Sequence, residues 1–121
     1  MLTAAVIVFA IGALGGIVLA LHVLRNKLAP WALSILHALL GATGLVLLIL
    51  LLMNGGAPLL GWSLALFVVA ALGGFWMASR HAQKELPPKG VVVLHALLAV
   101  SGFVLLLAVF LGADTGTGTP A

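Results

Sequence analysis

Charged residues are scarce in this chain. Of its 121 residues, 6% are charged and 64% are hydrophobic, with five Lys or Arg and two Asp or Glu side chains. A soluble domain carries about 25% charged residues, so this chain lacks the charge needed to cover a folded core with a hydrated surface. Lipid is the solvent that suits such a surface. The sequence therefore predicts an integral membrane protein with no nucleic-acid partner.

Cysteine and tyrosine are absent. The lack of cysteine excludes disulfides, iron–sulfur clusters and thiolate metal sites, and the lack of tyrosine excludes tyrosyl acid–base or radical chemistry. Four histidines remain as the main candidates for metal or cofactor chemistry: His22, His37, His81 and His95.

Four long apolar runs predict four transmembrane helices, at about residues 2–24, 31–53, 59–80 and 91–111. Each run is long enough for about 30 Å of hydrocarbon at roughly 1.5 Å per residue. The first run has no basic residue before it and no small-residue cleavage site, so we interpret it as a retained helix and not a signal peptide. We expect one transmembrane domain over residues 1–121, with a disordered Gly- and Thr-rich tail at 113–121.

The basic residues lie in two of the three breaks between these runs. All five Lys and Arg fall in residues 25–30 and 80–90, whereas the middle break, 54–58, carries none. The positive-inside rule places the two basic loops in the cytoplasm. We therefore predict a multi-pass protein of the plasma (inner) membrane with both termini on the non-cytoplasmic side.

The two halves of the chain are similar. A shift of 58 residues aligns the Leu-Gly-Gly at 14–16 with that at 72–74, and the Leu-His-Ala-Leu-Leu at 36–40 with that at 94–98. The same shift aligns Pro30 with Pro88 and Gly44 with Gly102. We predict an all-α four-helix up-down bundle made of a tandem repeat of two helical hairpins, with units at about 1–54 and 59–112.

His37 and His95 are the ionisable residues clearly within the hydrocarbon, and the repeat relates them. An ionisable residue inside a membrane indicates a functional site by default. In an up-down bundle their helices are diagonal, so the two imidazoles would approach the centre from opposite sides. His22 and His81 lie nearer the cytoplasmic ends of the first and third helices.

Glycines lie about two turns deeper than the histidines on each helix. They leave a strip without side chains beside each imidazole, which is the shape that the edge of a porphyrin needs. The glycines assigned to this strip are Gly15, Gly41, Gly44, Gly74 and Gly102.

This arrangement predicts one six-coordinate haem b with His37 and His95 as its iron ligands, a centre suited to electron transfer. Its propionates would point to the cytoplasmic surface, where Arg80, His22 and His81 are candidates to meet them. A second haem held by His22 and His81 is the alternative stoichiometry.

The segments Leu-His-Ala-Leu-Leu-Gly at 36–41 and Leu-His-Ala-Leu-Leu-Ala at 94–99, each followed by a glycine, resemble helices of membrane b-type cytochromes of the cytochrome b561 type. The resemblance implies non-covalent haem b held by paired helix histidines, with electrons passing to or from quinone or a partner. Many such cytochromes place two haems at opposite membrane faces, whereas all four histidines here favour one face.

Other readings of the same residues remain open. Small residues let membrane helices pack closely without a cofactor. His37 and His95 could make interhelical hydrogen bonds to Ser34, Thr43 or Ser101, or could serve a bare metal, proton or quinone site. The main alternative function is a cofactor-free structural or assembly subunit that works with other membrane subunits or as a homo-oligomer. A stand-alone enzyme is less favoured than either subunit role. A proton-coupled exporter is disfavoured because no carboxylate lies within a span.

Overall fold

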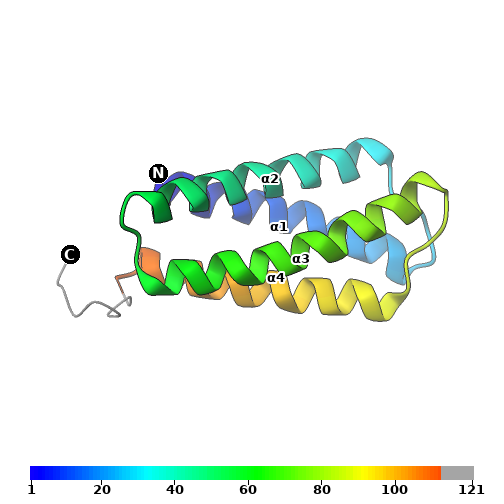
Figure 1. Ribbon diagram of the computed structural model, residues 1–121. Helices are drawn as coiled ribbons and strands as arrows, with labels where there is room; N and C mark the ends of the chain where they lie inside the picture. The colour runs from blue at the N-terminus through cyan, green and yellow to red at the C-terminus, as the bar shows by residue number, and fades with distance from the viewer. Residues whose placement is uncertain (113–121) are drawn as a thin grey trace.

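The four hydrophobic runs form four α-helices in the computed structural model, which describes residues 1–112 (Figure 1). Helix α1 spans Leu2–Leu24, α2 spans Trp31–Met53, α3 spans Pro58–Ala82 and α4 spans Lys89–Phe110. Each helix is long and apolar enough to cross a membrane, with mean hydropathy between 1.9 and 2.7. The prediction of four helices of membrane-spanning length is confirmed. The predicted disorder of residues 113–121 lies outside the described residues.

Two helices differ from the predicted boundaries at their ends. Helix α3 begins one residue earlier than predicted, at Pro58, because proline at the first helical position needs no partner for an N–H group. It continues to Ala82, with Arg80 and His81 in its last turn, where cationic groups are favoured. Helix α4 begins at Lys89, directly after the extended Pro88, and ends at Phe110.

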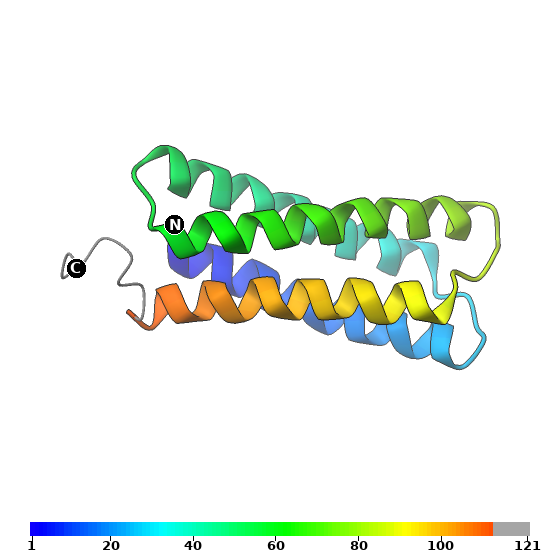
Figure 2. The same ribbon diagram turned by 60° about the horizontal axis from the view of Figure 1, so that its bottom comes forward.

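The helices lie side by side with their connections alternating between the two ends of the bundle. The connection from α1 to α2 and that from α3 to α4 lie at one end, and the α2–α3 connection lies at the other with the start of α1 (Figures 1 and 2). Helix α1 contacts α2 and α4, and α3 also contacts α2 and α4. Helices α1 and α3 therefore face each other across the centre, as do α2 and α4.

The hydrophobic core fills one half of the bundle. Phe9 of α1 and Phe67 of α3 stack across the centre, with ring centroids 4.0 Å apart and planes 1° from parallel. The other buried members of this core cluster are Ala5, Leu48, Leu60 and Leu106. All six lie in the half that contains the α2–α3 connection. Beyond Gly12 and Ala70, toward the two basic connections, the buried residues of the described chain are Val92 and Pro87.

Large apolar side chains cover the outside of the bundle. Leu14 and Leu72 are each 66% exposed, and many other Leu, Ile and Val side chains are similarly exposed. A soluble monomer rarely presents such continuous apolar surface. The outer face of the bundle is therefore suited to a lipid bilayer.

Candidate functional site

His37 and His95 approach each other across the centre of the bundle. His37 comes from α2 and His95 from the diagonal helix α4, and both are half-buried. Their ring centroids are 6.3 Å apart and the ring planes are 75° apart. The two deepest histidines of the sequence therefore form one pair.

Each imidazole of the pair is held by a backbone carbonyl of the preceding helix. His37 Nδ1 lies 2.8 Å from the Gly12 carbonyl oxygen on α1. His95 Nδ1 lies 2.7 Å from the Ala70 carbonyl oxygen on α3. A carbonyl oxygen only accepts, so Nδ1 carries the hydrogen in both rings. When the ring is neutral, Nε2 then holds the lone pair, which is the arrangement that metal-ligating histidines adopt.

Two glycines leave room for these rings. A Cβ atom added at Gly16 would lie 2.9 Å from His37 Cε1, and one added at Gly74 would lie 3.2 Å from His95 Cε1. Gly15, by contrast, would bring a Cβ only to 4.0 Å from His37 Cβ. Sequence reasoning assigned Gly15 and Gly74 and took Gly16 for simple helix packing. The shift of 58 residues pairs Gly16 with Gly74, so the repeat carried the signal for Gly16.

The deeper glycines accommodate the phenylalanine stack. A Cβ added at Gly44 would lie 2.5 Å from Phe9 Cζ, and one added at Gly102 would lie 3.3 Å from three atoms of the Phe67 ring. Gly41 has no such neighbour within 4 Å. The strip predicted beside each imidazole is therefore open at Gly16 and Gly74, whereas the aromatic rings fill it at Gly44 and Gly102.

His81 connects the two hairpins near the basic connections. Its Nε2 lies 2.9 Å from the Ala29 carbonyl oxygen, to which it must donate. Its Nδ1 then accepts from the Ser34 hydroxyl, 2.7 Å away. The Trp31 ring packs edge-on against it, with centroids 4.6 Å apart. Both ring nitrogens of His81 are thus engaged, and Ser34 bonds His81 and not His37.

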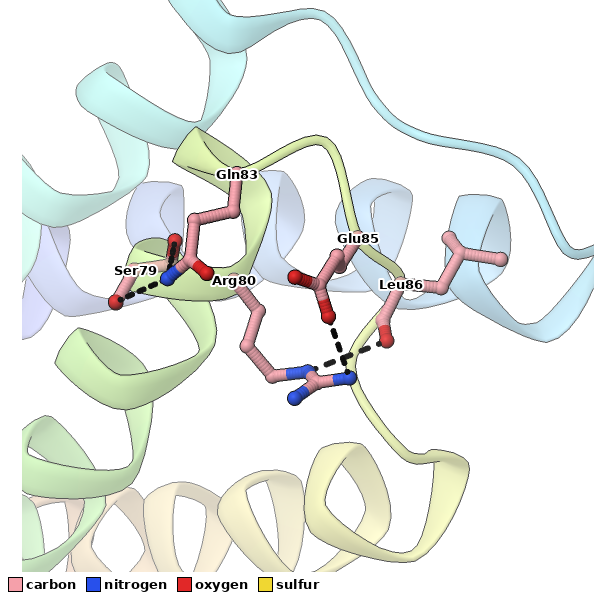
Figure 3. Close-up of polar contacts among 5 residues, drawn as sticks. All are labelled: Ser79, Arg80, Gln83, Glu85 and Leu86. Atoms are coloured by element: carbon pink, nitrogen blue, oxygen red, sulfur yellow. Dashed lines mark hydrogen bonds and ion pairs between the residues drawn. The ribbon is translucent and has the colours of Figure 1, made fainter.

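Arg80 is anchored within its own connection (Figure 3). Its Nη2 lies 3.2 Å from Glu85 Oε2, and its Nε donates to the Leu86 carbonyl oxygen over 3.4 Å. The guanidinium also lies over the Trp76 ring, 5.3 Å from its centroid. Gln83 in the same connection donates to Ser79. The structure therefore places a carboxylate on the cation that was assigned to haem propionates.

His22 bonds within its own helix, away from the central pair. Its Nδ1 donates to the Val18 carbonyl oxygen over 2.8 Å. With Arg25 and Lys27 it lines a surface recess at the end of α1. Thr43, another suggested histidine partner, donates to the Leu39 carbonyl oxygen of its own helix, and Ser101 is exposed. Only His37 and His95 are brought together in the centre.

Within residues 1–112, no group of three or more His, Cys, Asp or Glu side chains could hold a metal ion together. A structural zinc site needs four protein ligands, so the described part of the chain does not build one. The histidine pair offers two ligands.

Comparison with known proteins identified no relative. No protein-family model matches the chain, and no curated protein or solved structure matches it.

Proposed function

We propose that this chain is a small membrane b-type cytochrome, or the haem-bearing subunit of a membrane electron-transfer complex, with one haem b between His37 and His95. The observation that carries the proposal is the central imidazole pair. Two imidazoles on one metal, with bonds of about 2 Å, have ring centres roughly 6 Å apart, and the ring centroids here are 6.3 Å apart. The bound haem would supply one-electron transfer.

The number and state of the ligands also support haem. A porphyrin provides four nitrogen ligands to iron, so two histidines complete six coordination. The carbonyl oxygens of Gly12 and Ala70 orient the two rings and leave Nε2 as the ligand atom. Such carbonyl bonds raise the basicity of a ligating imidazole. The residues present therefore fit the group that the sequence suggested.

The packing of the bundle fits the same position. The cluster around Phe9 and Phe67 closes one half of the bundle, whereas the half toward the basic connections has few buried residues. Gly16 and Gly74 keep side chains away from the two rings. A planar cofactor has more room on the side of the basic connections than on the side of the phenylalanine stack.

One haem is proposed and not two. A second centre would need Nε2 or Nδ1 of His81 as a ligand, and both atoms are engaged by Ala29 and Ser34. We place both basic connections in the cytoplasm and both termini on the opposite side of the plasma membrane, as the positive-inside rule indicates. Quinone or another membrane subunit would exchange electrons with the haem.

The proposal includes an up-down bundle built from a repeated hairpin. The hydrogen bonds of His37 and His95 join positions related by the same shift of 58 residues, and so do the stacked rings of Phe9 and Phe67. Gly44 and Gly102 are related in the same way. A duplicated hairpin supplies one imidazole from each unit.

A cofactor-free structural subunit is the second candidate, and one observation favours it. The bonds from His37 to Gly12 and from His95 to Ala70 each tie the two helices of one hairpin together. Interhelical hydrogen bonds of this kind stabilise membrane helices by about 0.6 kcal/mol on average. In this reading the histidines need no ligand.

The visible spectrum separates the two candidates. The protein is expressed with ample haem supply, purified in detergent and measured oxidised and after reduction with dithionite. The cytochrome predicts a sharp Soret band and reduced α and β bands. A colourless, folded protein would refute the haem proposal and leave the structural subunit.

A further inference from the structure

The two basic connections have the same backbone conformation. In the first, Asn26 has φ +58° and the Lys27 N–H donates to the His22 carbonyl oxygen over 2.8 Å. In the second, Lys84 has φ +59° and the Glu85 N–H donates to the Arg80 carbonyl oxygen over 2.9 Å. Both are helix C-terminal motifs closed by a left-handed residue. Their side chains can therefore be compared position by position.

Their charges differ sharply. In the second connection, Glu85 forms an ion pair with Arg80, so a cation and an anion neutralise each other (Figure 3). In the first connection, the corresponding positions hold Lys27 and His22, and Arg25 adds a further cation. The sequence from 1 to 112 contains one carboxylate side chain, Glu85, so the first connection has no internal anion.

The cations of the first connection surround a recess. His22, Arg25 and Lys27 line it together with Val18 and Leu21, and its volume is about 180 Å³. Val18 and Leu21 are each 43% exposed on the outer face of α1. The recess thus has a cationic rim at the end of a membrane-spanning helix and an apolar wall that continues down the outside of that helix.

We infer that this recess binds the phosphate headgroup of an anionic phospholipid, such as phosphatidylglycerol. Arg25 and Lys27 would neutralise the phosphate, and the remaining nitrogen of His22 would donate to a phosphate oxygen in its protonated form. The acyl chains would lie along Val18 and Leu21. Basic residues at the end of a transmembrane helix attract anionic lipids in this way.

The apolar wall favours a lipid over free phosphate. Val18 and Leu21 offer nothing to an inorganic anion, whereas they extend the contact for a molecule that carries acyl chains next to its phosphate. The inference does not depend on the proposed haem, because His22 lies outside the central pair and bonds within its own helix.

Native mass spectrometry of the detergent-purified protein tests the site by loss of function. Equal amounts of phosphatidylglycerol and phosphatidylcholine are added, and the lipids retained are counted. We expect the unmodified chain to prefer phosphatidylglycerol on the order of tenfold. Arg25→Gln with Lys27→Gln should abolish the preference. The matched control, Lys84→Asn with Lys89→Gln, removes the same charge from the other connection and should retain it.

Two single substitutions test the comparison of the connections directly. Lys27→Glu gives the first connection the acid of the second, and should abolish the preference because the anion then lies within the loop. Glu85→Lys gives the second connection the cation of the first, and should add a second retained phosphatidylglycerol. Circular dichroism confirms that each variant keeps its helicity.

Three results would overturn the inference. The first is an equal loss of phosphatidylglycerol in the double variant and its matched control, which would indicate attraction by overall charge. The second is complete displacement of the lipid by millimolar inorganic phosphate, which would remove the acyl chains from the site. The third is a helical double variant that keeps the full preference.

Discussion

The two hairpins, α1–α2 and α3–α4, share their central contacts and differ at their surface. Each places one imidazole on a carbonyl of its first helix, and each contributes one ring to the phenylalanine stack. They diverge at the basic connections, where Lys27 stands opposite Glu85, and at position 81, where the first hairpin has Val23 in place of histidine. The shared features lie at the centre and support the proposed haem site, whereas the differing ones give each hairpin its own contacts.

The largest expected effect concerns the shared imidazoles. His37→Ala or His95→Ala should abolish the Soret, α and β bands of the reduced protein, because each removes one of two proposed iron ligands. His22→Ala should leave the bands largely intact, since His22 bonds to its own helix.

The haem content per helical protein, measured by pyridine haemochrome and circular dichroism, checks this expectation. A loss of half the haem in His22→Ala would contradict the assignment of one haem to the central pair. Retention of full haem in both central variants would exclude them as ligands.

The second expectation uses a difference between equivalent glycines. A Cβ at Gly44 would lie 2.5 Å from the Phe9 ring, whereas a Cβ at Gly102 would lie 3.3 Å from the Phe67 ring. Overpacking costs about 1–3 kcal/mol, and alanine regains up to about 1 kcal/mol in helix propensity. Gly44→Ala should therefore lower the free energy of unfolding by about 1–2 kcal/mol, and Gly102→Ala should change it by less than about 0.5 kcal/mol.

Titration with sodium dodecyl sulfate, followed by far-UV circular dichroism, measures both variants. Equal destabilisation by the two substitutions would mean that the Phe9 ring has as much freedom to move as the Phe67 ring.

The third expectation concerns the histidine present in one hairpin only. His81→Val copies Val23 of the other hairpin and removes the bonds to Ser34 and Ala29. At about 0.6 kcal/mol for each interhelical bond, the loss should total about 1 kcal/mol in the same titration. Thr43→Val is the control, because Thr43 bonds only to its own helix. A control as destabilised as His81→Val would argue against a contact between hairpins.

The smallest expectation concerns a buried hydroxyl. Ser63 is fully buried, and its Oγ donates to the Gly102 carbonyl oxygen over 2.7 Å. The equivalent position in the first hairpin is Ala5, which is also fully buried. Ser63→Ala should cost about 0.6 kcal/mol, because a carbonyl that already accepts a helix bond tolerates the loss. A cost above about 2 kcal/mol would indicate that the hydroxyl also orders α3 against α4.

Hydropathy was sufficient to predict the four spans and the basic connections. A run of about 20 apolar residues has few alternatives to a transmembrane helix, and charge distribution indicates which connections lie at the same end. The repeat also identified His37 and His95, because composition bias does not explain matched histidines. The ends of α3 and α4 were less predictable, since Pro58 and Lys89 are compatible with either a helix or a loop.

The tertiary structure alone decided which groups meet. Adjacent residues on a helix point about 100° apart, so a small rotation of α1 determines that Gly16, and not Gly15, lies against His37. The same rotation brings the Gly12 carbonyl to His37 and directs Phe9 into the space beside Gly44. Ser34 lies on the same face of α2 as His37, yet the position of α3 gives it to His81. The sequence by itself determined four lipid-facing helices and a duplicated histidine, because burial in lipid depends on composition. The partners of each histidine depend on rotation and offset between helices, which packing determines.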